Sequence, residues 1–176
     1  MRARLRLGIL GALAALAVAS ARAAPSAEEV KAAFIFHFTQ FVEWPPATFA
    51  APDAPFVIGV LGDDAIAAAL TIIAQGERLG RHPFEIRRLR DPAYAADCQI
   101  VYVAGDEDGA FRAARLRGEP VLTVGESDDF IAAGGMIEFF VEHSRVRLRI
   151  NLPAARSSSL QISSKLLRVA EVLPSP

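Results

Sequence analysis

The chain has 176 residues, with 19 Lys and Arg against 20 Asp and Glu, and a net charge of −1 at pH 7. This length is enough for one domain with a buried core. The single cysteine, Cys98, excludes a disulfide within one chain.

The first 23 residues have the pattern of a secretory signal peptide. A basic start is followed by an apolar, alanine-rich run at residues 7–19, which is too short for an ordinary membrane span. Small residues at Ala21 and Ala23 match the positions that signal peptidase reads. We therefore expect cleavage after Ala23 and export to the periplasm, with an uncleaved anchor as the alternative.

Residues 24–176 are predicted to form the exported domain. This part keeps 15 of the 19 basic residues and all 20 acidic ones, a net charge of −5. An acidic exported domain is a poor binder of nucleic acid. Because no second long apolar run follows, we expect no direct insertion into a membrane.

The first predicted helix follows the export signal. Ser26 and Glu29 have the spacing of a capping box, in which each residue bonds to the other's backbone. The helix should run to about Trp44, where Pro45 and Pro46 stop it.

This helix is more apolar than packing on one sheet requires. Four residues on one stripe should pack on the sheet. They are Phe34, Phe38, Phe41 and Val42. Ile35 and Phe36 point elsewhere, so we expect the second side to meet another layer of the fold or a second subunit, with Trp44 closing the end.

Strands and helices alternate through the middle of the chain. The expected strands are residues 56–62, 84–89, 99–105 and 121–125, and the expected helices are residues 63–74 and 106–117. Most of these strands are apolar throughout, which is typical of a sheet covered on both faces. Cys98 begins one of them and is interpreted as a small buried side chain, with an intermolecular disulfide or a reactive thiol as alternatives.

The pattern changes near the C-terminus. A short helix is expected at residues 127–135, then a hairpin at 136–150 that turns at His143 and Ser144. A short helix and a longer one over residues 160–170 should close the chain. Together these elements predict a single-domain αβα sandwich with a mixed, mostly parallel sheet and a C-terminal antiparallel hairpin.

Acidic residues follow three of the predicted strands. They are Asp63, Asp64, Asp106 and Asp128. In open α/β sheets, the carboxyl ends of the strands border the ligand crevice, so these acids could hold a divalent metal. Capping of helix N-termini explains them more simply, and we expect neither a metal site nor a cofactor.

No catalytic pattern stands out, and we predict that the protein is not an enzyme. Ser163 and Ser164 beside Lys165 lack the S-x-x-K spacing, so an exported hydrolase is the minor alternative. The three histidines have no metal-ligand spacing. Of these, His37 is interpreted as a core or interface residue.

Five blocks resemble the YfiR family of periplasmic regulators. They are "VKAAFIFHFTQFVEWP", "FVIGVLGDD", "CQIVYVAG", "LTVGE…GGMIEFF" and "VRLRINLPAARSSSLQISSKLLRVA". The last block carries the most specific pattern, I-N-L-x-A-A-R followed by L-x-I-S-S-x-L-L-x-x-A. The blocks occur in order and cover nearly all of the chain after the export signal.

This resemblance implies a non-catalytic role. It implies a protein that binds and inhibits the periplasmic sensing domain of a membrane-anchored diguanylate cyclase, which lowers cyclic di-GMP and biofilm formation. It also implies a homodimer and sequestration by an outer-membrane lipoprotein. The alternative is a small-molecule sensor that acts with a sensor kinase or a transport system. Because Cys98 stands alone, redox control by a disulfide within the chain is not carried over.

We expect partner contacts at Phe-Phe in the hairpin and at polar residues of the last block. These candidates are Phe139, Phe140, Arg149, Asn151, Arg156, Ser163, Ser164 and Lys165. Two of them have plain structural alternatives: Asn151 could cap a helix, and Ser163 could simply be small enough to let the helix pack.

Overall fold

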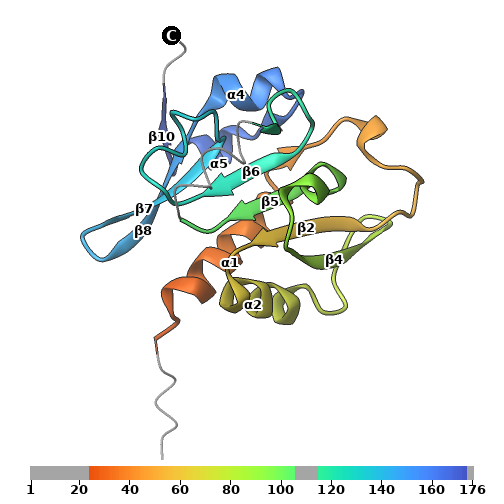
Figure 1. The fold of residues 1–176 in the computed structure, drawn as a ribbon, viewed down its shortest axis with the longest axis horizontal. Helices are drawn as coiled ribbons and strands as arrows, with labels where there is room; N and C mark the ends of the chain where they lie inside the picture. The colour runs from red at the N-terminus through yellow and green to blue at the C-terminus, as the bar shows by residue number, and fades with distance from the viewer. Residues whose placement is uncertain (1–23, 106–114, 174–176) are drawn as a thin grey trace, which may run out of the picture.

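The computed structural model describes residues 24–105 and 115–173 as a mixed α/β fold around one eight-stranded sheet (Figure 1). The strands lie in the order β10-β8-β7-β6-β5-β2-β4-β3. Their bounds are Phe56–Leu61 (β2), Arg78–Leu79 (β3), His82–Leu89 (β4), Ile100–Val103 (β5), Leu122–Gly125 (β6), Ile137–Glu142 (β7), Arg145–Ile150 (β8) and Glu171–Val172 (β10). Neighbouring strands are parallel, except that β7 with β8 and β3 with β4 are antiparallel. The predicted fold class is confirmed.

Helices and a second, two-stranded sheet surround the large sheet. The helices are Ala27–Phe38 (α1), Asp64–Ala74 (α2), Leu152–Ser157 (α4) and Ser164–Leu167 (α5), with 3-10 turns at Pro46–Thr48 (η1) and Pro92–Asp97 (η2). The small sheet pairs Val42–Glu43 (β1) with Gln161–Ile162 (β9) in antiparallel fashion. The predicted signal peptide and most of the helix expected at 106–117 lie outside the described residues.

The core occupies both faces of the sheet. On one face, α1 and α2 lie side by side under the strands (Figure 1) and share a buried cluster with them, which includes Ile35, Phe56 and Leu70. On the other face, a smaller cluster gathers Val101, Leu116 and Phe130. Cys98 is buried in this second cluster, as its interpretation as a small apolar residue predicted.

The first helix is shorter than its apolar sequence suggested. The capping box of Ser26 and Glu29 is confirmed, but α1 ends at Phe38, so the prediction of a helix to Trp44 was wrong. The hydroxyl of Thr39 donates to the Phe36 carbonyl at 2.7 Å and helps to close the last turn. The chain then extends because Val42 pairs with Ile162, a partner 120 positions away that helix periodicity does not reveal.

The prediction that Ile35 and Phe36 point away from the large sheet was wrong: both are buried in the cluster that α1 shares with the sheet, whereas Phe34 and Phe41 are only partly buried. The Phe36 ring packs against Phe84 of β4 with centroids 4.9 Å apart. Trp44 closes the end: its ring lies edge-on to Phe56, and its Nε1 donates to the Gln99 carbonyl at 3.0 Å. By contrast, His37 is exposed, which contradicts a place in the core, and its alternative role at an interface stays a prediction.

The longer C-terminal helix predicted over residues 160–170 was also wrong. Gln161 and Ile162 form β9, and only Ser164–Leu167 is helical. The amide of Ser163 donates to the Phe41 carbonyl at 2.8 Å, which holds this part of the chain extended against β1. Pairing between distant segments therefore overrides the local helical stripe.

Turns replace the short helix predicted at residues 127–135. The fully buried ring of Phe130 sits between two glycines, Gly125 and Gly135, at whose positions a Cβ atom would lie within 2.4 Å and 2.2 Å of the ring. The amide of Gly135 donates back to the Phe130 carbonyl at 2.8 Å. This close packing on the sheet fixes a tight series of turns.

Candidate functional site

The hairpin of β7 and β8 projects from the sheet (Figure 1) and carries three of the predicted partner residues. Its two-residue turn has φ values of 49° at His143 and 60° at Ser144, so both residues are left-handed. Turns of this kind match the twist of the strands they join. The predicted turn position is confirmed.

The two phenylalanines of β7 face opposite sides of this hairpin. The Phe139 side chain is 2% exposed, and its ring lies 6.1 Å from Phe34 and 6.2 Å from Phe38 between centroids. Phe140 is half-buried on the other face. Only Phe140 is therefore available to a partner in this conformation, and Phe139 holds the hairpin on α1.

Arg149 lies at the centre of a charged cluster on the Phe140 side. Its guanidinium donates to Glu138 Oε1 at 2.6 Å and to Glu171 Oε2 at 3.2 Å, and it stacks 4.6 Å above the Phe140 ring centroid. The Glu138 side chain is only 4% exposed. Burial raises the pKa of Glu138, and the charge of Arg149 only partly offsets this effect. Arg149 therefore compensates a buried carboxylate as well as forming part of the surface.

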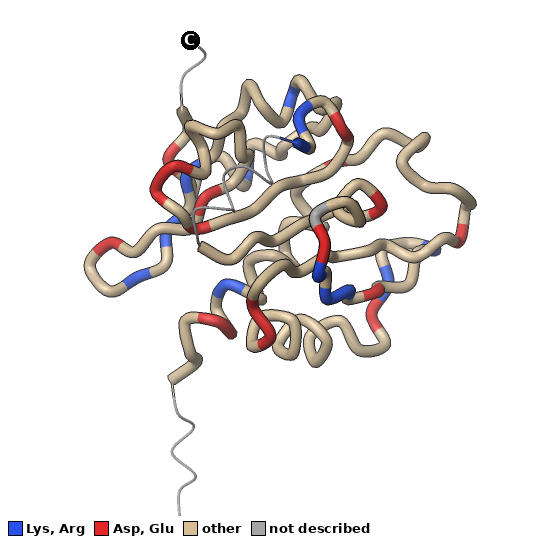
Figure 2. Tube along the Cα trace, viewed as in Figure 1, with Lys and Arg blue, Asp and Glu red and all other residues tan. Residues whose placement is uncertain are grey.

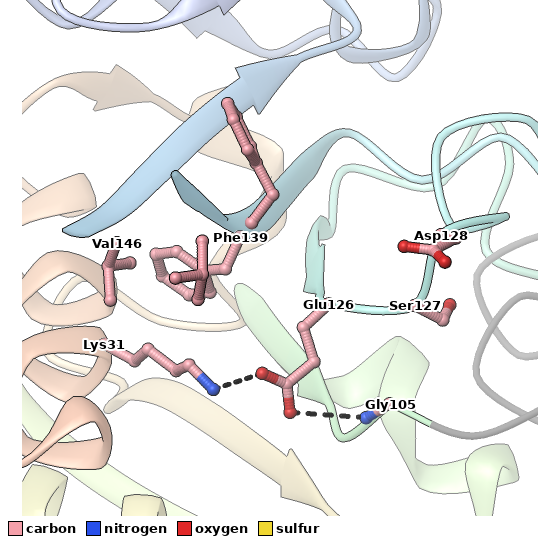
Figure 3. A pocket seen from close by; sticks show the side chains of 9 residues that line it. Lys31, Gly105, Glu126, Ser127, Asp128, Phe139 and Val146 are labelled. Carbon is pink, nitrogen blue, oxygen red and sulfur yellow. Dashed lines mark hydrogen bonds and ion pairs between the residues drawn. The ribbon is translucent and has the colours of Figure 1, made fainter. Parts of the chain in front are cut away.

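A second cluster, which the sequence did not single out as a site, joins α1 to the ends of β5 and β6. The ammonium of Lys31 forms an ion pair with the Glu126 carboxylate, and the two side chains point toward each other (Figure 3). The hydroxyl of Tyr102 donates to the other Glu126 oxygen at 2.8 Å. Lys31 and Glu126 are 13% and 25% exposed, so water screens this pair only partly.

The ionisation of this cluster follows from its contacts. Burial raises the pKa of Glu126, but hydrogen bonds from Lys31 and Tyr102 outweigh it and bring the pKa below its ordinary value. Burial, together with the Glu126 charge, raises the pKa of the Tyr102 hydroxyl. Glu126 is thus a carboxylate at neutral pH, and Tyr102 stays a hydrogen-bond donor.

An open cavity of about 570 Å³ separates this cluster from the hairpin. Its polar side is formed by Lys31, Glu126 and Asp128, and its apolar side by Phe139 and Val146, as Figure 3 shows. Val141 at the rim is 70% exposed. Apolar and charged side chains therefore face each other across this cavity.

The remaining predicted partner residues lie on other elements. Asn151 caps α4 by accepting from the Ala154 amide at 3.1 Å, and Ser163 caps α5 by accepting from the Lys165 amide at 3.3 Å. The last three candidates are exposed: Arg156, Ser164 and Lys165. The eight candidates are thus spread over the hairpin, α4 and α5, and their contact with a partner stays a prediction.

Two of the four acidic residues at the strand ends, Asp63 and Asp64, have structural roles. Asp63 caps α2 by accepting from the amides of Ala65 and Ile66, each at 2.9 Å. Asp64 forms an exposed ion pair with Arg88 at 3.3 Å, and Asp128 is exposed beside the cavity. Asp106 lies outside the described residues. Within residues 24–105 and 115–173, no three His, Cys, Asp or Glu side chains are grouped to hold a metal ion.

Two features of the sequence could have marked Lys31 and Glu126 as candidate site residues. Lys31 is the one lysine or arginine of a largely apolar helix, and Glu126 directly follows the last residue of a buried strand. A charge placed among apolar residues usually needs an opposite charge nearby. Their mutual pairing was not visible, because the two residues lie 95 positions apart.

These features define a small α/β domain whose surface carries a cluster of aromatic, arginine and carboxylate side chains. A sequence model of the YfiR/HmsC-like family matches residues 28–171, and the chain belongs to this family. The resemblance seen in the five sequence blocks is thereby confirmed. At the level of the family, these proteins are periplasmic regulators of diguanylate cyclases.

A search of curated proteins gave no significant match. None of the helices in the described residues is both long enough and apolar enough to cross a membrane.

Proposed function

We propose that the protein is a non-catalytic regulator that binds the periplasmic domain of a membrane-anchored diguanylate cyclase and holds the cyclase inactive. Membership of the YfiR/HmsC-like family over residues 28–171 carries this proposal. Inhibition would lower cyclic di-GMP and reduce biofilm formation. The proposal includes export with loss of residues 1–23, a homodimer, and release of the cyclase by an outer-membrane lipoprotein.

The hairpin surface supports a role in protein binding. Phe140 is half-buried beneath Arg149, so part of its ring is open to a partner. Aromatic and arginine side chains contribute most to binding at protein interfaces when they are already held in place. The contacts of Arg149 with Glu138 and Glu171 hold it in this way.

Deletion of the gene tests this function in cells. Cyclic di-GMP and surface attachment should rise in the deletion strain and return to normal when the wild-type gene is restored. A Phe140→Ala variant should restore them less well at equal protein abundance. Unchanged cyclic di-GMP in a strain that expresses the protein before deletion would argue strongly against the proposal.

The cavity between Lys31 and the hairpin favours a second candidate function, a small-molecule sensor that acts with a sensor kinase or a transport system. The cavity, of about 570 Å³, combines the Glu126 carboxylate and the Lys31 ammonium group with apolar side chains. A thermal-shift screen with periplasmic metabolites tests this candidate. A melting temperature that no metabolite changes would remove its support.

A further inference from the structure

Strand β8 is paired along its whole length on one side but only at its end on the other. β7 pairs with every residue from Arg145 to Ile150. β10 pairs only with Arg149 and Ile150. In the described part of the chain, the outer edge of β8 from Arg145 to Leu148 therefore has no neighbouring strand.

The register shows which backbone groups face this open edge. In a hairpin with a two-residue turn, alternate residue pairs exchange hydrogen bonds, starting with the pair beside the turn. The Asn151 amide donates to the Met136 carbonyl at 2.8 Å, and Leu173 donates to Ile150 at 2.9 Å. Both bonds fit a ladder in which the amides of Val146 and Leu148 point away from β7.

A groove runs beside this edge. It is about 510 Å³ in volume, and its lining includes Phe34, Val146, Arg147, Arg168 and Val169. Val169 is 64% exposed, and the Arg147 side chain is 51% exposed. In Figure 2 the arginines of β8 stand as blue segments on the projecting hairpin. Two carboxylates, Glu142 and Glu171, also line the groove, and Glu142 lies 3.9 Å from the Arg147 guanidinium at the exposed surface. An added strand would thus have apolar contacts on one face and, on the other, arginines that exposed carboxylates neutralise only in part.

A second copy of the chain is a poor occupant of this edge. Antiparallel pairing of two β8 edges requires a two-fold axis normal to the sheet, which places the arginines of both copies on the same face. Arg145 and Arg147 would then lie opposite arginines of the other copy, and like charges in that position destabilise a sheet. A strand with acidic side chains at alternate positions would instead meet these arginines with opposite charge.

We propose that the outer edge of β8, at Arg145–Leu148, binds an extended segment of the partner protein whose acidic and apolar side chains alternate. The segment would extend the sheet in line with β10, with its carboxylates against Arg145 and Arg147. Its apolar side chains would lie over Val146, Phe34 and Val169. This inference deepens the proposed function and rests on it for the partner's identity.

Two valine-to-proline variants separate edge pairing from contact with the hairpin in general. Val146→Pro removes an amide that faces the open edge, and Val141→Pro makes the same change in the residue directly opposite on β7. The Val141 amide faces away from β8, so both variants keep the bonds between β7 and β8. Binding of the cyclase periplasmic domain should weaken about tenfold or more for Val146→Pro and stay near wild type for Val141→Pro.

A charge reversal provides a test that leaves the backbone intact. Arg147→Glu should weaken binding by a similar factor, whereas Arg81→Glu, in the exposed turn between β3 and β4 at the far edge of the sheet, should not. Urea unfolding shows whether each variant is folded. Equal loss of binding by both proline variants, or retained binding by Val146→Pro and Arg147→Glu, overturns edge pairing.

A synthetic probe tests the edge without the cyclase. A peptide of about seven residues with alternating Glu and Val should shift the NMR signals of the Val146 and Leu148 amides and protect them from hydrogen exchange. The same peptide with Lys in place of Glu should not. If the Glu peptide leaves both amides unchanged, the inference is wrong. If it binds there but the cyclase domain does not bind the protein, the proposed function is wrong and the edge site remains.

Discussion

Lys31 and Glu126 form an ion pair between the first helix and the end of β6, across 95 positions of the chain. The Tyr102 hydroxyl completes the group from β5 with a bond of 2.8 Å to Glu126. One carboxylate therefore ties together a helix and two neighbouring strands beside the cavity. Its contribution to stability should depend on pH in a way that its contacts define.

We predict that protonation of Glu126 makes the protein less stable in acid. Its pKa in the folded state lies below the ordinary 4.5, because the bonds from Lys31 and Tyr102 outweigh burial. Stabilisation is therefore present above the unfolded-state pKa and is lost as pH falls through the folded-state pKa. Urea unfolding from pH 3 to 7 should show Glu126→Gln less stable than wild type at neutral pH, with the difference shrinking in acid. A difference that does not change with pH contradicts this account.

Glu138 should give the opposite pH dependence. Burial raises its pKa above the ordinary 4.5 despite the charge of Arg149. The folded state then holds its proton more tightly, so stability falls as pH rises from the unfolded-state pKa through the folded-state pKa. The same titration should show Glu138→Gln gaining stability relative to wild type as pH rises. If the stability of Glu126→Gln and of Glu138→Gln, each relative to wild type, changed with pH in the same direction, the pKa values of the two carboxyls would not be shifted in opposite directions.

Alanine replacements should separate the roles of the two hairpin phenylalanines. Phe139→Ala removes a ring that is 2% exposed, and we expect the free energy of unfolding to fall by about 3–5 kcal/mol. Phe140→Ala removes a half-buried ring stacked under Arg149, and we expect a loss of about 1 kcal/mol. Urea denaturation measures both. If both variants repress the cyclase as well as wild type in cells, neither phenylalanine contributes to partner binding.

Gly135 should not tolerate a side chain. A Cβ atom at this position would lie 2.2 Å from the Phe130 ring and 2.7 Å from the Phe130 carbonyl oxygen. We expect Gly135→Ala to lower the free energy of unfolding by about 1–3 kcal/mol. The cost should shrink in a Phe130→Leu background, which a double-mutant cycle measures. If the effects of Gly135→Ala and Phe130→Leu on the free energy of unfolding simply add, the cost of Gly135→Ala does not come from the Phe130 ring.

The thiol of Cys98 should be unreactive in the folded protein. The side chain is 1% exposed, and burial raises its pKa to about 11. Because the thiolate is the reactive form, Ellman's reagent at pH 8 should label the native protein slowly and the urea-unfolded protein at an ordinary rate. Fast, stoichiometric labelling of native protein would instead support the alternative of a reactive thiol.

The sequence by itself determined the elements that depend on local patterns. The strands β2, β5 and β6 appear as continuous apolar runs, and Asp63 and Ser26 mark helix starts because capping involves only residues three or fewer positions away. The hairpin turn at His143 was visible from the alternation of valine, leucine and isoleucine with arginine in β8. The five family blocks identified the family for the same reason, since they are read directly along the chain.

Only the tertiary structure decided features that join distant segments. Val42 and Ile162 pair as strands, although both belong to sequences with a helical stripe, because pairing and burial outweigh local propensity. The partners of Lys31 and Arg149, and the length of β8 that β10 leaves uncovered, depend on how the sheet is ordered. Local periodicity carries no information about that order, so the open edge of β8 became visible only in the folded chain.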